Sequence, residues 1–131
     1  MKSKIGAVLA ATGWIGLMEF GRNTYLLRGH WQQHYGAMGQ VFPESPTNAA
    51  VWGLWSLLVA WFIYRLSRRF TFAETVGLSW MAAFAWMWLV IGNLGVLPYA
   101  ILRWAVPLSL LEVLGATWLI TRLSPVENPK S

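Results

Sequence analysis

The sequence contains no cysteine and little charge. Only 11% of its 131 residues are charged, and five acidic residues stand against ten lysines and arginines. Without cysteine the chain has no disulfide, no thiolate metal site and no thiol nucleophile, which excludes several classes of enzyme. Walker, dinucleotide-binding, HExxH and GxSxG patterns are also missing, so no motif indicates a reaction. The basic residues form no dense cluster, and we therefore expect no nucleic-acid partner.

Apolar residues, in contrast, make up 56% of the sequence, and ten tryptophans, six phenylalanines and four tyrosines are among them. A soluble domain of this length has too small an interior to bury so many large side chains. A bilayer accommodates them on the outer faces of membrane helices. The composition therefore predicts an integral membrane protein whose first partner is the lipid bilayer.

Four apolar stretches are long enough to cross the hydrocarbon core, which takes about 20 helical residues. They lie at about 5–27, 48–66, 72–91 and 98–123, with an external connection at about 28–47 and a flexible polar tail at 124–131. The first stretch has no small-x-small cleavage site near its end, so we expect a retained helix and not a signal peptide. The fold class that follows is all-α, a one-domain integral membrane four-helix bundle.

The ends of these stretches carry recognisable signals. Ser45 and Pro46 suit the start of the second, and Thr71 and Glu74 have the spacing of a capping box at the start of the third. The last stretch either begins at Pro98 as one kinked helix or has a short interfacial piece before a span from about Val106. We favour the first alternative.

The distribution of basic residues predicts the orientation in the membrane. With the N-terminus inside, the cytoplasmic set is Lys2, Lys4, Arg65, Arg68, Arg69, Arg122 and Lys130, against Arg22, Arg28 and Arg103 toward the other side. Both termini are therefore expected in the cytoplasm, and a multi-pass protein of the bacterial inner membrane is the expected location.

Small and polar residues recur at helical spacing and predict the faces that the helices turn to one another. These residues are Thr12, Gly16, Glu19 and Asn23 in the first stretch; Ala49, Gly53, Ser56 and Ala60 in the second; Thr75, Ser79, Ala82, Trp86 and Asn93 in the third; and Ser109, Glu112 and Ala116 in the fourth. We expect a tightly packed and modestly polar interior.

Glu19 and Glu112 are carboxylates within membrane stretches, where a charge is costly and by default indicates a functional site. Glu19 follows Lys4 by fifteen residues and Glu112 precedes Arg122 by ten. At 1.5 Å of rise per residue, both then lie roughly 15–22 Å from the cytoplasmic basic residues. The two carboxylates are expected to share one layer of the bundle.

Two interpretations of this layer remain open. In the structural one, Glu19 and Arg22 neutralise each other, and Asn23 and Asn93 satisfy nearby backbone groups. In the functional one, Glu19 and Glu112 handle a proton or a cation, because two close carboxylates in a low dielectric cannot both ionise easily.

His30 and His34 stand four residues apart, and Met38 follows one helical turn later, which is the chemistry of a copper ligand set. The segment also contains three glycines, which weaken the helix that would align these side chains. We therefore favour a solvated loop over a metal site. No cofactor is expected, and haem in particular is disfavoured because neither histidine lies within an expected span.

The function that we expect from the sequence is lateral association, as an accessory or assembly subunit of a larger membrane complex or by self-association. The alternative is a small oligomeric transporter or channel that couples to protons or cations through Glu19 and Glu112. An intramembrane enzyme would depend on the acidic pair alone and is the least favoured.

Overall fold

A computed structural model describes residues 2–126, so most of the expected tail, with Glu127 and Lys130, lies outside the described residues. The described part of the chain is all helical and contains no strand. Its elements are α1 (Lys2–Phe20), the π-helical turn η1 (Gly21–Leu26), α2 (Arg28–Ala37), α3 (Pro46–Ser67), α4 (Phe72–Trp80), the π-helical turn η2 (Met81–Ala85), α5 (Trp86–Asn93), the 3-10 turn η3 (Tyr99–Ile101) and α6 (Leu102–Leu123).

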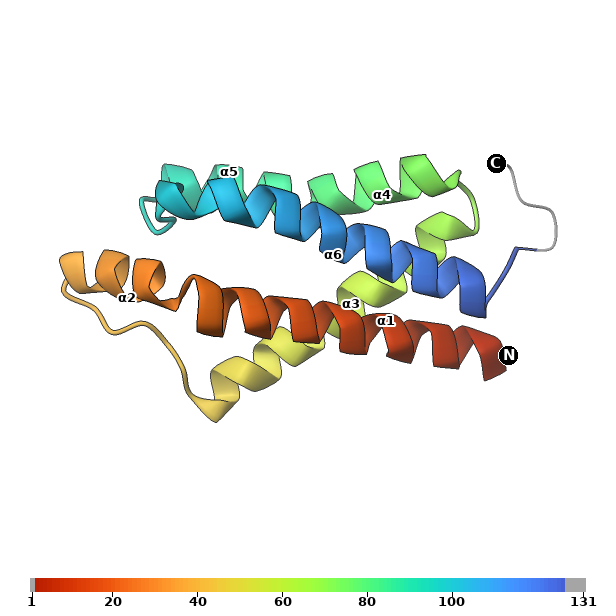
Figure 1. Ribbon diagram of the computed structural model, residues 1–131, viewed down its shortest axis with the longest axis horizontal. Coiled ribbons are helices and arrows are strands. Elements are labelled where there is room, and N and C mark those ends of the chain that lie inside the picture. Colours follow the sequence, from red (N-terminus) through yellow and green to blue (C-terminus); the bar gives the residue numbers. More distant parts are fainter. Residues whose placement is uncertain (1, 127–131) are drawn as a thin grey trace.

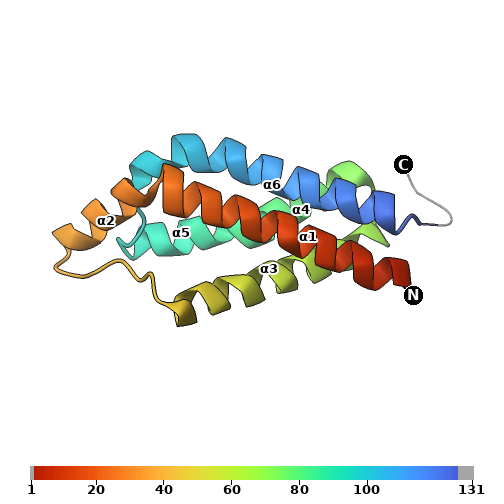
Figure 2. The ribbon, with the colours of Figure 1, turned by 60° about the horizontal axis from the view of Figure 1, so that its bottom comes forward.

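The helices run alongside one another in an elongated bundle (Figure 1). α1 packs on α6 and α3, and α4 packs on the same two helices. α1 continues through η1 into α2, and α4 continues through η2 into α5 (Figure 2). One end of the bundle holds the first turn of α1 and the last turn of α6, and we call it the basic end after Lys4 and Arg122. The other end, which holds α2, is called the α2 end.

The starts of α3 and α4 are fixed by side chains that cap free backbone N–H groups. The Ser45 hydroxyl accepts a hydrogen bond from the Asn48 N–H at 3.2 Å, and Pro46 occupies the first turn of α3. Thr71 and Glu74 bond each other's backbone N–H at 2.9 and 3.2 Å, so the expected capping box is confirmed. These caps satisfy donors that the helices themselves leave unpaired.

The 3-10 turn η3 begins directly after Pro98 and runs into α6 at Leu102. Pro107 lies inside α6, whose helix continues on both sides of it. The segment from Tyr99 to Leu123 is thus one continuous helical rod, and no separate interfacial piece precedes it.

Within residues 2–126, three helices are long and apolar enough to cross a membrane, namely Pro46–Ser67, Phe72–Asn93 and Tyr99–Leu123. Only 22% to 39% of their most apolar windows is buried inside the protein. So much outward apolar surface requires an apolar surrounding, which lipid provides. The chain is therefore a membrane protein whose helices contact the bilayer. α1 is not one of the three, since Lys4 and Glu19 bound its apolar run.

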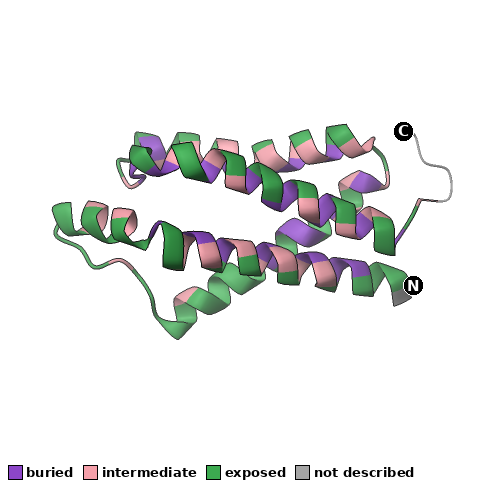
Figure 3. Cartoon of the chain, in the orientation of Figure 1, coloured by how far each residue is buried: buried purple, intermediate pink, exposed green. Residues whose placement is uncertain are grey.

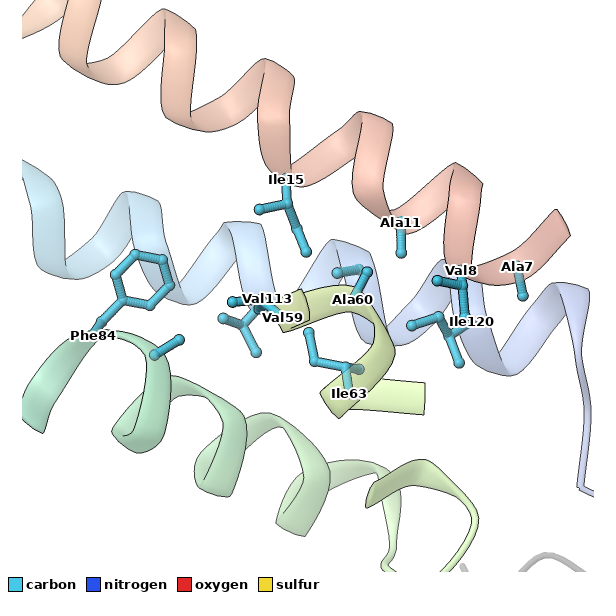
Figure 4. Close-up of a cluster of buried hydrophobic side chains, with 12 residues drawn as sticks. Ala7, Val8, Ala11, Ile15, Val59, Ala60, Ile63, Phe84, Val113 and Ile120 are labelled. Carbon is cyan, nitrogen blue, oxygen red and sulfur yellow. The ribbon is translucent and has the colours of Figure 1, made fainter. Parts of the chain in front are cut away.

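The apolar core consists of two separate clusters. The larger joins α1, α3, η2 and α6 (Figure 4), with side chains of α4 packed against it, and its residues lie on the buried stripes that the helices turn to one another (Figure 3). The smaller cluster lies toward the α2 end and consists of Leu27, Leu97, Ile101 and Ala105. Between the two clusters lies a layer of polar side chains, which holds the candidate site.

The π-helical turns change which residues face inward. A π turn carries one residue more than an α turn, because its hydrogen bonds span five residues. In η2 the Trp86 N–H accordingly bonds the Met81 carbonyl. The expected inward positions of Trp86 and Asn93 are therefore wrong: both are exposed, while Phe84 and Gly92 are buried.

Candidate functional site

Glu19, Arg22 and Glu112 form a buried cluster in the polar layer. Arg22 Nη2 lies 2.5 Å from Glu19 Oε1, and Arg22 Nη1 lies 3.4 Å from Glu112 Oε1. The exposed fraction is 5% for Glu19, 7% for Arg22 and 0% for Glu112. Buried charges persist only with partners, and here one guanidinium serves two carboxylates. We call this group the Glu–Arg–Glu cluster.

Local spacing positions the α1 side of the cluster. Glu19 and Arg22 stand three residues apart on one helix face, and Asn23 stands four residues after Glu19. The Asn23 amide donates to Glu19 Oε2 at 3.0 Å, and the Trp31 indole donates to Asn23 Oδ1 at 3.0 Å. Both oxygens of Glu19 therefore have partners, and a chain of hydrogen bonds connects Glu19 to α2.

Trp14 positions the α6 side of the cluster. Its indole Nε1 donates to the backbone oxygen of Glu112 at 2.8 Å. The ring fits into a notch at Gly115, where a Cβ atom would lie only 2.5–2.8 Å from indole atoms. Such contacts do not occur between real side chains, so only glycine allows α1 and α6 this close approach. The notch thereby fixes the depth of Glu112 relative to Glu19.

The charges of the cluster do not balance. Two carboxylates face one guanidinium, and Glu112 Oε2 has no hydrogen-bond partner among residues 2–126. A buried site in a low dielectric strongly favours neutrality. The cluster becomes neutral when it holds either one proton or one additional cation, so its composition suits an exchange between the two.

A cavity of about 580 Å³ reaches the cluster from the α2 end. Glu19, Arg22 and Asn23 line its floor. Its walls are largely aromatic and include Trp31, Tyr35, Phe42, Trp52 and Trp88. This volume falls within the range of about 300–1,000 Å³ that is typical of pockets for small organic ligands.

Small residues of α1 and α3 also line this cavity, and for part of them the expected close packing of helices is wrong. Gly16, Ala49, Gly53 and Ser56 were expected to bring the helices into close contact. Ala49 and Gly53 are instead exposed, and all four line the cavity. At Ala49 and Gly53 the absence of large side chains leaves the space open, whereas Gly16 and Ser56 lie where α1 and α3 pack, with a Cβ at Gly16 only 3.8 Å from the Ser56 hydroxyl oxygen. Small residues at helical spacing can indicate either close packing of two helices or an open space between them, and the sequence alone does not distinguish the two.

The remaining candidate residues lie apart from the cluster. Asn93 is exposed at the end of α5 and does not line the cavity. His30 and His34 lie on α2, which is helical despite its glycines, and a His34 ring nitrogen lies 2.7 Å from the Gly95 carbonyl oxygen. Met38 follows the last residue of α2 and is exposed. Within residues 2–126, no group of three or more histidine, aspartate or glutamate side chains is placed to hold a metal ion.

Comparison of the chain with protein-family models, with curated proteins and with solved structures found no match.

Proposed function

We propose that the chain is a small membrane transporter in which the Glu–Arg–Glu cluster exchanges a proton for a cation that arrives through the cavity. One observation carries the proposal: two buried carboxylates share one guanidinium, and Glu19 and Arg22 of this group line the floor of a cavity. A purely structural ion pair would be complete with one carboxylate. The second carboxylate adds a buried negative charge that only a proton or a cation can offset.

The unequal distances within the cluster suggest how the exchange proceeds. Arg22 lies closer to Glu19 than to Glu112, and Glu112 is the carboxyl that then holds the proton in the neutral cluster. A cation entering from the cavity approaches Glu19, which lines the floor. Arg22 then shifts toward Glu112 as that carboxyl releases its proton. The total charge of the cluster stays zero, so one proton leaves for each positive charge that binds.

The proposal includes a topology. α1 serves as a fourth span beside the three more apolar helices, giving a four-helix membrane bundle. Lys4, Arg65, Arg68, Arg69 and Arg122 gather toward the basic end, which supports placing this end and both termini in the cytoplasm. The α2 end then faces the exterior, and a bacterial inner membrane is the proposed location.

Reporter fusions check this topology. A reporter that works only in the cytoplasm should be active when fused after Ser124. A reporter that works only outside the cytoplasm should be active when inserted near Gln40. An externally accessible reporter after Ser124 would reverse the orientation and place the α2 end on the cytoplasmic side.

The exchange itself is tested by proton release. Purified protein in weakly buffered detergent is mixed with sodium, tetramethylammonium or decyltrimethylammonium ions, and a pH-indicator dye follows released protons. At least one cation should release one proton per ion bound, because the cluster stays neutral. The Glu74→Gln variant is the control, since Glu74 lies outside the cavity and glutamine can also serve the capping box. If no cation binds, or binding releases no proton from wild-type protein, the proposed exchange is wrong.

A second candidate function is association as an accessory subunit, and the exposure of α3 favours it. Val51, Leu54 and Leu58 are 55% to 60% exposed along one half of this helix. Lipid or another membrane protein can cover such a face. Purification in mild detergent distinguishes the two: a stoichiometric foreign subunit supports association, and its absence removes the reason for preferring a protein partner to lipid.

A further inference from the structure

The cavity is closed on two sides by aromatic side chains. Toward α5, Trp88 lines the cavity and packs on the Phe84 ring at a centroid distance of 5.4 Å. Toward the α2 end, Trp31 stacks on Phe42 at 5.5 Å, and Tyr35 meets the same ring edge-on at 5.2 Å. Packed aromatic rings therefore obstruct entry into the cavity from these two sides.

The connection between α2 and α3 is held down over the cavity at the α2 end. Glu44 pairs with Arg28 at 3.0 Å and accepts a hydrogen bond from Gln32 at 3.3 Å. The segment that carries Phe42 is thus tied to α2 through Glu44 as well as through the aromatic contacts of Phe42. A ligand that came directly from the water at this end would have to displace it.

The third side, between α1 and α3, is open. Phe20, Ala49, Trp52 and Gly53 line the cavity and are also exposed. A Cβ atom at Gly53 would have nothing within 4 Å, so no side chain fills this part of the mouth. Figures 1 and 2 show the Pro46 end of α3 diverging from α1, although the two helices pack together nearer the basic end. With α1 and α3 both spanning the membrane, as proposed above, this mouth opens sideways toward lipid.

The cavity lining indicates the chemistry of a ligand that would use this mouth. Aromatic ring faces attract organic cations, quaternary ammonium groups in particular. The carboxylate excess at the floor attracts a single positive charge. The walls and the volume exceed what a bare inorganic ion or a methylammonium head can contact, so they suit a ligand that also has an apolar body.

We propose that the cavity takes an amphiphilic organic cation that enters sideways from the bilayer, between the diverging halves of α1 and α3. The cationic head reaches Glu19, and the apolar body lies between the aromatic walls and extends toward the mouth. This inference deepens the proposed function and rests on it, since the same cluster supplies the charge that the head group neutralises.

The test compares two probes with the same head group in protein reconstituted into nanodiscs, with empty nanodiscs correcting for partitioning into lipid. Decyltrimethylammonium should bind at least about tenfold more tightly than tetramethylammonium, because only the former fills the walls. Equal affinities for the two ions, each with linked proton release, would overturn the amphiphile and leave the exchange standing. Failure of both ions to release a proton would instead overturn the exchange.

The mouth is tested by the Gly53→Trp variant, with Gly77→Trp on α4 as the matched control. Both glycines are exposed, and a Cβ atom at either would have nothing within 4 Å, but only Gly53 lines the cavity. Gly53→Trp should slow decyltrimethylammonium binding by about tenfold, and Gly77→Trp should not. If Gly53→Trp lowers the unfolding temperature, Ala49→Trp takes its place at the same rim. Unchanged binding rates in a folded rim variant would exclude sideways access.

Discussion

Glu112→Gln is expected to bind decyltrimethylammonium at least about a hundredfold more weakly than wild type and to release no proton, while remaining folded. Glutamine keeps the volume of glutamate but cannot give up a proton. Arg22 and the ligand would then share Glu19 alone, and the buried site would carry a net positive charge. Two unit charges about 4 Å apart interact with about 4 kcal/mol at the effective dielectric of a protein, which is ample for this loss.

Isothermal titration over a range of pH measures the effect. Wild-type affinity should rise with pH, because the proton and the ligand compete for one cluster. Glu112→Gln should show weak affinity with no such slope, and Glu74→Gln should match wild type. A Glu112→Gln protein with wild-type affinity and wild-type pH dependence would contradict the exchange.

Arg22→Leu is expected to lower the free energy of unfolding by about 3–5 kcal/mol at neutral pH, the usual cost of removing one partner of a buried ion pair. Glu19 and Glu112 would remain buried without their shared cation. A bound proton can offset the missing positive charge, so the loss should grow as the pH rises. Unfolding of the variant by sodium dodecyl sulfate in mixed micelles, at several pH values, measures this dependence.

Two further variants make the result specific to the cluster. Adding Glu19→Gln to Arg22→Leu removes one of the two unpaired carboxylates and should restore part of the lost stability. Arg28→Leu breaks the ion pair between Arg28 and Glu44, whose side chains are 50% and 36% exposed, respectively. This variant should lower the free energy of unfolding by less than about 1 kcal/mol. Equal losses in the single and double variants would show that the carboxylates are not energetically coupled through Arg22.

The sequence allowed much of the α1 side of the cluster to be predicted. Contacts within one helix follow from spacing alone, so Glu19, Arg22 and Asn23 could be placed together before the fold was known. The common depth of Glu19 and Glu112 followed from counting residues to flanking charges. Trp14 and its notch at Gly115 could not be found this way, because their contact joins residues far apart in the chain.

Other features could not be predicted from the sequence because tertiary contacts override the local preferences of the residues. The glycines of α2 lower its helix propensity, but Leu27 and Trp31 pack against the apolar cluster at the α2 end and hold the segment in place. The turn η2 carries an extra residue, so a strict three-and-four count loses its phase after Met81 and misplaces Trp86. The prediction of a membrane protein is not affected by such errors, because it depends on the composition of a whole helix.

The two ends of α3 differ in a way that bears on motion. Near the basic end, Ala60 and Ile63 are fully buried, and Arg68, just past the helix, bonds the Ser124 carbonyl. The opposite half borders the cavity through Ala49, Trp52 and Gly53, all of which are exposed. α1 and α6, in contrast, are locked together midway along their length by the indole in the glycine notch. α3 is therefore anchored at the basic end only, whereas α1 and α6 hold each other midway along their length.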